Sequence, residues 1–332
     1  MGQVAEKTGV AVITTPAPEA VATGGPQTVK GFTVYDAMLL GMVVVWAANP
    51  AGIKWALRYM DPLVFNSLRF LLATMFPVTL ALLNKEKLRP LPGDWWRILG
   101  LGLIGHGFYQ FLFIMAINNT LAGNVVLILS INPAFVAVFS ALFGYERIRV
   151  YTWIGVLLSL AGVSLVVLGS GEELHFGSRL LGDAIMLAVT VMWALYTVLS
   201  QPLLKRYSAV KLNALTMPVG ATVLLLAATP ALVGTTPQWT VVPASVWLVM
   251  ALSGLLAVSA SYIIWYKGIQ KLGSSRTSVY SNLVPVLGAV ISAVFLGESL
   301  GWQFWAGMVL VLAGVTTARF GARLFGRMRF GG

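Results

Sequence analysis

One segment of this sequence occurs twice, and the duplication constrains the fold more strongly than any other feature. Residues 116–163 return as residues 268–315, at a constant offset of 152 positions and without a gap. Shared apolar composition can align leucine with leucine, but it does not readily align proline, glutamate and tryptophan at one offset. The aligned pairs of these three types are Pro133 and Pro285, Glu146 and Glu298, and Trp153 and Trp305. A repeat of this kind predicts two copies of one structural unit.

The chain is too poor in charge to be a water-soluble domain. It has 332 residues, of which 58% are hydrophobic and 10% are charged, whereas soluble domains carry about 25% charged residues. Long apolar runs explain the difference, because a helix of about 20 apolar residues crosses a bilayer. We predict an all-α integral membrane protein, with the lipid bilayer as its surroundings. Its ten spans are expected at about residues 33–53, 62–83, 95–117, 121–143, 151–169, 181–201, 211–232, 245–269, 276–296 and 302–320.

The basic residues predict the orientation of these spans. Net charge is +11, and a basic balance can indicate nucleic-acid binding, but here Lys and Arg lie in short clusters between apolar runs. If the N-terminus is cytoplasmic, 18 of the 22 Lys and Arg residues fall on the cytoplasmic side and three on the outer side, as the positive-inside rule requires. We therefore predict no nucleic-acid partner and a cytoplasmic (inner) membrane protein with both termini in the cytoplasm. Residues 1–30, rich in Ala, Thr, Pro and Gly, are expected to form a disordered cytoplasmic tail.

A second regular match extends the repeat toward the N-terminus. At an offset of 147 positions, Trp46 aligns with Trp193. The chain therefore divides into two units of five spans, over residues 31–170 and 180–322. Because five is odd, the second unit is expected to enter the membrane in the opposite direction. Inverted repeats of this kind are typical of transporters whose substrate site lies at the membrane midplane between the halves.

The motifs at the end of each unit resemble those of a known family. Each unit carries the Pro, Ala, Ser-Ala, Phe and Glu positions of the repeat, followed by W-x-G-x-x-L-x-L-A-G-V. This pattern resembles the paired EamA domains of the drug/metabolite transporter superfamily. Within that superfamily, the aromatic-rich spans are most similar to bacterial amino-acid exporters of the YddG type. The resemblance implies export of amino acids and related metabolites by alternating access across the inner membrane.

The residues offer little support for an enzyme. No cysteine is present, which excludes disulfides, thiolate metal sites and a cysteine nucleophile. The two histidines lack a zinc-binding spacing and no carboxylate pair lies in mid-membrane, so we predict no catalytic activity, no metal and no cofactor. Gly100, Gly102 and Gly105 match the G-x-G-x-x-G pattern of dinucleotide sites, but they lie inside an apolar helix with no strand before them. We interpret them as glycines that let two helix backbones approach closely.

Aromatic and polar side chains recur at helical spacing in the middle of four spans. Spacings of three and four residues put the members of each set on one helix face. Trp and Tyr normally concentrate at membrane interfaces, but these lie deeper, so we predict that they line a central substrate cavity. An aromatic pocket suits amino-acid side chains, and also flat organic cations through cation–π contacts. The predicted cavity residues are Trp46, Asn49, His106, Tyr109, Gln110, Trp193, Tyr196, Tyr262 and Trp265.

Two other spans contain a proline beside polar residues. Pro133 and Pro285 each remove a backbone donor and free a carbonyl group, which needs a partner or a cavity inside a membrane. The neighbouring polar side chains could satisfy the helix locally, or they could bind the ammonium and carboxylate groups of a substrate. These side chains are Ser130, Asn132, Ser281 and Asn282.

Three charged residues are candidates for gating or for a structural role. Glu146 and Glu298 follow the fourth span of each unit and could gate the site, but we favour a structural role, in which they hydrogen-bond the following turn or pair with Arg147. Arg69 is the one charge well inside a span, where charged groups are functional candidates by default. It could attract a substrate carboxylate, although we favour a structural role in which it snorkels to the membrane surface or pairs with Asp61.

The predicted function is export of amino acids, aromatic ones included. A multidrug or organic-cation exporter of the same fold is the alternative, and a non-transporting receptor or scaffold is the less favoured class. His106 is the only mid-span group that titrates near neutrality, and it could line the cavity or hydrogen-bond in a packing interface. Because no Asp or Glu lies at that depth, the sequence favours a facilitator, or a carrier driven by the substrate gradient, over a proton-coupled one. A monomer is plausible, although the sequence does not fix the oligomeric state.

Overall fold

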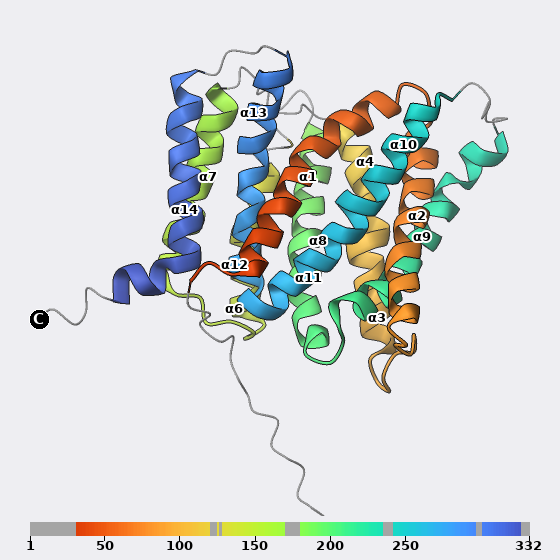
Figure 1. Cartoon of the computed structure of the whole chain (residues 1–332), viewed down its shortest axis with the longest axis horizontal. Coiled ribbons are helices and arrows are strands. Elements are labelled where there is room, and N and C mark those ends of the chain that lie inside the picture. Colours follow the sequence, from red (N-terminus) through yellow and green to blue (C-terminus); the bar gives the residue numbers. More distant parts are fainter. Residues whose placement is uncertain are drawn as a thin grey trace, which may run out of the picture.

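The computed structural model describes residues 31–119, 125, 128–169, 180–234, 242–296 and 301–326. Across these ranges every regular element is a helix (Figure 1), which confirms the predicted all-helical fold. Seven of the described helical segments are long and apolar enough to cross a membrane, and two further apolar helices are shorter. The predicted tail and Glu298 lie outside the described residues.

The helices follow the order expected from the sequence. The first unit contains α1 (Val34–Ala56), α2 (Pro62–Leu83), α3 (Trp95–Gly102), the π-helical η1 (Leu103–Phe108), α4 (Tyr109–Asn119), α6 (Asn132–Leu142) and α7 (Val150–Gly169). The second contains α8 (Leu180–Leu204), α9 (Ala209–Gly234), α10 (Ala244–Leu252), the π-helical η2 (Ser253–Ala260), α11 (Ser261–Leu272), α12 (Ser274–Val279), the 3₁₀-helical η3 (Tyr280–Asn282), α13 (Leu283–Leu296) and α14 (Trp302–Gly326). Some helix therefore lies in each predicted span, while the number of membrane crossings stays a prediction.

The first two helices begin at residues that satisfy free backbone donors. The Thr33 hydroxyl accepts a hydrogen bond from the Asp36 backbone, and the Asp36 carboxylate accepts one from the Thr33 N–H at 2.7 Å, a reciprocal capping box. At the start of α2, Asp61 Oδ1 accepts from the backbone N–H of Leu63 at 2.9 Å. Asp61 is therefore engaged at the helix N-terminus, where a carboxylate also favours the positive end of the helix dipole.

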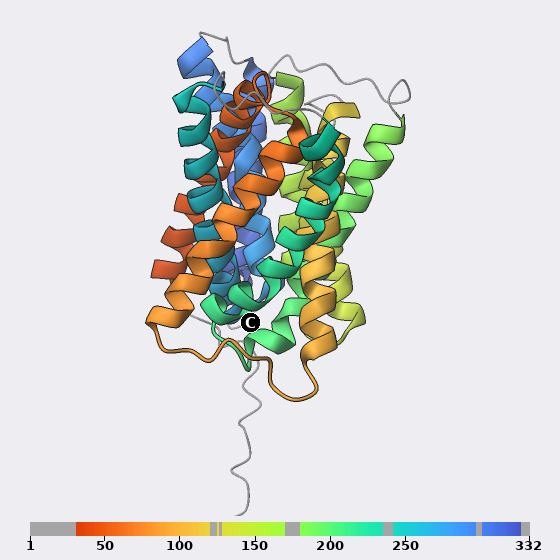
Figure 2. The same ribbon diagram turned by 90° about the vertical axis from the view of Figure 1, so that its right-hand side faces the viewer.

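The two units interlock, because the main helix contacts pair an element of the first unit with one of the second. In the described ranges, α7 packs on α14, α2 on α9 and α4 on α8. The first helix of each unit makes corresponding contacts with the other unit. Helix α1 lies against α11 and α13, and α8 lies against α4 and α6. The helices run roughly side by side (Figures 1 and 2), and the largest buried hydrophobic cluster draws residues from both units. The core is thus shared between the units.

Glycines bring α7 and α14 together at one end of the molecule (Figure 1). A Cβ atom added to Gly307 would lie 2.5 Å from the carbonyl oxygen of Gly162, and one added to Gly314 would lie 2.6 Å from that of Gly155. Helix association in a membrane depends on such close van der Waals packing, because lipid tails are as apolar as the helices. The backbones of α7 and α14, the last helices of the two units, are therefore in direct contact.

A second close approach involves the glycines of the third span. A Cβ atom on Gly102 would lie 2.7 Å from the carbonyl oxygen of Thr216 in α9, and one on Gly105 would overlap the ring of Tyr196 in α8. The prediction that these glycines let helices approach closely is confirmed, except at Gly100, where an added Cβ meets nothing within 4 Å.

Replacing Gly307 by Ala is expected to destabilise the protein, because the new methyl group would meet backbone atoms that cannot rotate away. Overpacking of this kind costs about 1–3 kcal/mol. Gly100→Ala is the matched control, since it adds the same methyl group in open space and gains about 0.5–1 kcal/mol of helix preference. The midpoint of thermal unfolding of the detergent-purified variants checks this prediction. A midpoint for Gly307→Ala at or above that of the wild type would contradict it.

Candidate functional site

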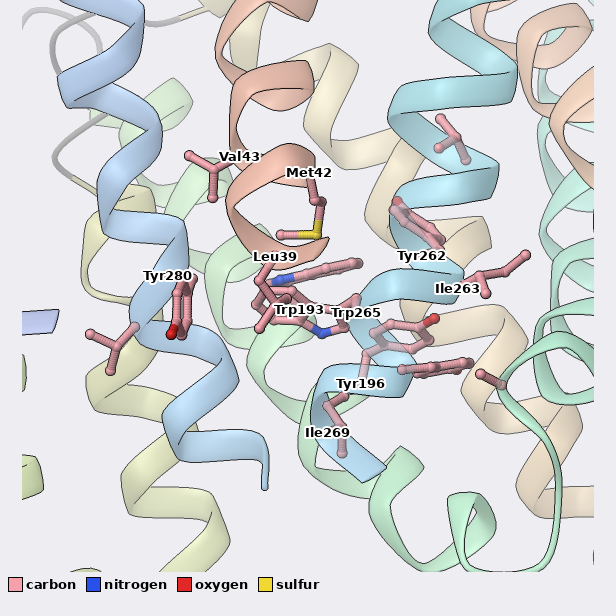
Figure 3. Close-up of a cluster of buried hydrophobic side chains, with 14 of the residues drawn as sticks. Leu39, Met42, Val43, Trp193, Tyr196, Tyr262, Ile263, Trp265, Ile269 and Tyr280 are labelled. Carbon is pink, nitrogen blue, oxygen red and sulfur yellow. The ribbon is translucent and has the colours of Figure 1, made fainter. Parts of the chain in front are cut away.

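Six aromatic side chains meet at the centre of the bundle, and Trp193 of α8 is the hub. We refer to Trp46, Tyr109, Trp193, Tyr196, Tyr262 and Trp265 as the aromatic cluster. The ring of Trp193 lies 5.0 Å from those of Tyr109 and Tyr196, 5.3 Å from Tyr262 and 5.6 Å from Trp265. The Trp46 ring is 6.1 Å away, edge-on. Figure 3 shows Trp193, Trp265 and Tyr196 lying together beneath α1. All six are among the nine predicted cavity residues, and two more of the nine, His106 and Gln110, contact Tyr262 of the cluster.

The indole N–H groups of two tryptophans in the cluster donate hydrogen bonds. Trp46 Nε1 donates to the backbone carbonyl of Ala257 at 2.8 Å, and Trp265 Nε1 donates to Thr197 Oγ1 at 3.1 Å. Buried indoles usually need such acceptors. These bonds tie α1 to η2 and α11 to α8, so they fix the cluster across both units.

The third helix of each unit changes to π-helix beside the cluster. The π-helical segments η1 and η2 precede Tyr109 and Tyr262 respectively, and π-helical turns are frequent at functional sites. Ala257, whose backbone carbonyl accepts from Trp46, lies in η2. The sequence did not predict these segments, although η1 contains two glycines and η2 contains one glycine and two serines.

His106 lies in η1 at the edge of the cluster and is fully buried. Its Nε2 atom is 3.1 Å from Thr216 Oγ1 of α9 and 3.4 Å from the hydroxyl of Tyr196. Its ring stacks on that of Tyr262 at 5.4 Å. From the sequence, His106 is expected either to line the cavity or to hydrogen-bond in a packing interface. In the structure it hydrogen-bonds between helices and also contacts the aromatic cluster.

Arg69 of α2 forms a buried polar network that the sequence did not predict. Nη2 donates to Asn66 Oδ1 at 2.7 Å and to Gln110 Oε1 at 3.2 Å, and Nη1 donates to Ser253 Oγ at 3.1 Å. The expected pairing with Asp61 is wrong, because that carboxylate caps α2. Snorkelling is also wrong, since Arg69 is only 5% exposed. One signal for this network was in the sequence, where Asn66 repeats as Asn213 at the offset of 147.

The proline-linked polar residues behave in two ways. Ser281 donates to the carbonyl of Ser278 at 2.7 Å, so it satisfies the helix locally. Asn132 and Asn282 are buried, and neither amide oxygen nor amide nitrogen of either residue has a hydrogen-bond partner in the described protein. Pro133 lies in the first turn of α6, where its missing N–H is tolerated.

The remaining residues of the predicted site lie in less informative surroundings. Ser130 is buried just before α6, Pro285 is half-buried in α13, and Asn49 is half-buried in α1. Within the described ranges, no group of three or more His, Asp or Glu side chains is placed to hold a metal ion.

Glu146 links three helices at one end of the bundle. Its carboxylate accepts from Ser274 Oγ at 2.8 Å and from the Ser275 backbone N–H at 3.3 Å, at the start of α12. It also accepts from the side-chain amide of Gln201 in α8. The expected partners were the following turn and Arg147, and both expectations are wrong: Glu146 binds elements of the other unit.

An ion pair missed by the sequence joins the two ends of the described chain. Arg319 Nε of α14 donates to Asp36 Oδ1 at 2.7 Å, and Arg319 Nη2 donates to Asp36 Oδ2 at 3.1 Å. Both side chains are buried. The residues are 283 positions apart, and no sequence pattern connects them.

Comparison with known proteins decides the family. The profile of the EamA-like transporter family matches residues 33–168 and again residues 180–319. The chain belongs to the EamA-like transporter family. This confirms the resemblance to paired EamA domains, and the protein is a membrane transporter.

Relatives of this EamA-like transporter are similar along most of their length. An "Uncharacterized transporter" of Archaeoglobus fulgidus is 30% identical over 83% of this chain and 95% of its own. "Uncharacterized transporter YyaM" of Bacillus subtilis is 29% identical over 85% and 92%. A "Probable amino-acid metabolite efflux pump" of Salmonella typhimurium is 28% identical over 86% and 95%. A solved crystal structure shares the fold with a TM-score of 0.72 at 21% identity, covering 88% of this chain and 98% of that one.

The two unpartnered asparagines give a prediction for this EamA-like transporter. Replacing Asn282 by Leu is expected to leave thermal stability unchanged or raised, because an unsatisfied buried polar group costs about 1–3 kcal/mol, while transport is expected to fall. Asn66→Leu is the control, since it breaks the bond to Arg69 and should lower stability by at least about 1 kcal/mol. Unfolding midpoints and efflux from liposomes, measured on the same preparations, check both. Equal destabilisation by the two variants would contradict a ligand-binding role for Asn282.

Proposed function

We propose that this EamA-like transporter exports amino acids, aromatic ones included, as YddG-type exporters do. The observation that carries the proposal is Trp193, whose ring contacts all five other members of the aromatic cluster. Such rings offer a large apolar surface for a side chain, and the nearby amides and hydroxyls offer hydrogen bonds for its polar end. The Salmonella relative's name, an amino-acid metabolite efflux pump, supports the same substrate class.

Alternating access is the proposed mechanism. We propose ten spans in two inverted five-helix repeats, located in the inner membrane with both termini in the cytoplasm. The corresponding contacts of α1 and α8 with the opposite unit support a two-fold relation. The cluster draws helices from both units, so rocking of one unit against the other would expose it to either side.

Glu146 supplies a candidate gate for this mechanism. Its bonds to α8 and α12 lie at the end of the bundle that is cytoplasmic in the proposed topology, and they would have to open for a substrate to enter. Glu298, its counterpart in the repeat, is proposed as the outer gate. The driving force is proposed to be the substrate gradient, because the described acidic residues all lie at helix ends or in loops.

Export of organic cations is the competing function. Arg69 disfavours it, because its buried positive charge would repel a cation. Arg69 lies close to the cluster, since Gln110 hydrogen-bonds both to Arg69 and to Tyr262. A non-transporting receptor is disfavoured by membership of a transporter family.

Efflux of labelled phenylalanine from liposomes containing the purified protein tests the proposal. Trp193→Ala is expected to slow efflux at least about tenfold, as loss of a central aromatic anchor typically does, and Trp193→Phe should retain part of the rate. Trp302→Ala removes a tryptophan that is 72% exposed and should change the rate by less than about twofold. Efflux should not depend on an imposed pH gradient. No efflux of any amino acid, together with efflux of a cationic dye, would reject the proposal in favour of a cation exporter.

A further inference from the structure

Arg69 carries a positive charge inside the helix bundle with no anion beside it. The three groups that accept its hydrogen bonds, from Asn66, Gln110 and Ser253, are all uncharged. Its Nε atom is buried with no acceptor in the described protein. Buried charges are normally paired, because neutral acceptors repay only part of the free energy lost on leaving water. An anion at this position would supply the counter-charge and accept from the free N–H group.

The same network leads directly to the aromatic cluster. Gln110 accepts from Arg69 through Oε1 at 3.2 Å and donates through Nε2 to the hydroxyl of Tyr262 at 2.8 Å. Tyr262 in turn lies 5.3 Å from Trp193, ring to ring. A small molecule with a carboxylate at one end and a ring at the other would therefore meet both features. The guanidinium group suits this task, since its planar fork of donors matches a carboxylate.

The part of the chain that the structure describes holds six carboxylates, and none belongs to this network or to the cluster. They are Asp36, Asp61, Glu86, Asp94, Glu146 and Asp183, all in loops, at caps or in the first turn of a helix. Asp36 is paired with Arg319, and Asp94 with Arg206. The described site thus has a fixed positive charge for a carboxylate and no fixed negative charge for an ammonium group.

We infer that Arg69 anchors the substrate's carboxylate and that the transported class is aromatic monocarboxylates, in which the amino group is not required. This inference rests on the proposed function, because it assigns a substrate group to the same site. It extends that function to aromatic acids that lack an amino group.

Three probes with the same phenyl ring test the inference in liposomes containing the wild-type protein. Unlabelled phenylalanine, phenylpropionate, which lacks the amino group, and phenylethylamine, which lacks the carboxylate, compete with labelled phenylalanine. Phenylpropionate is expected to compete within about tenfold of phenylalanine, and phenylethylamine is expected to compete about 100-fold more weakly than phenylpropionate. Direct efflux of labelled phenylpropionate is measured in parallel.

The outcomes separate the inference from the proposed function. Phenylalanine efflux with equal competition by phenylethylamine would reject the anchor and leave the proposed function standing. Phenylpropionate efflux without phenylalanine efflux would reject amino-acid export and keep the anchor. Absence of efflux of either compound would reject both.

A variant pair isolates the charge of Arg69. Arg69→Gln should reduce the preference for phenylpropionate over phenylethylamine from about 100-fold to less than about tenfold. Arg58→Gln removes the same charge from an exposed position after α1 and should leave the preference unchanged. The ratio of two competitors does not depend on how much protein has folded, so an unchanged ratio in Arg69→Gln would overturn the inference.

Discussion

The guanidinium group of Arg69 joins three helices at a place where it is shut off from solvent. Its hydrogen bonds to Asn66, Gln110 and Ser253 fix α2 relative to α4 and η2. Gln110 also donates a hydrogen bond to the hydroxyl of Tyr262, which fixes the position of that ring. Inside a membrane such groups must be satisfied within the protein. The position of the aromatic cluster therefore depends on a polar network of neutral groups around one cation, which leaves capacity for an anionic substrate.

The packing divides the molecule into parts with different freedom to move. The contact between α7 and α14 brings backbones together at glycines. The ends of α6, α8 and α12 are instead joined through Glu146, by hydrogen bonds that can exchange for water. The aromatic cluster lies among helices of both units, so a change at the Glu146 end would alter its access without disturbing the α7–α14 contact.

The fold was more predictable than the site. The double alignment of proline, glutamate and tryptophan identified the repeat, and the spacing of Trp193 and Tyr196 put both on one face. Partners across the chain were not predictable: Arg69 was expected near Asp61, and Arg319 was not connected with Asp36 at all. Periodicity records which side of a helix is apolar, but it does not record which distant helix that side meets. The π-helical segments were also missed. In the structure η1 lies against α9 and η2 lies against α2, and these contacts with distant helices are not recorded in the sequence pattern.

The central claim is that the aromatic cluster is a transport site that opens to either side of the membrane. The chain contains no cysteine, so Thr197→Cys would carry a single thiol at a buried position that contacts Trp265. Membrane-impermeant thiol reagents, applied separately to each side of oriented vesicles, measure its accessibility. The account predicts labelling from both sides, slowed by phenylalanine from either. A thiol that reacts from neither side would show that the cluster is a packing core. A thiol that reacts from one side only, whatever the substrate, would contradict alternating access.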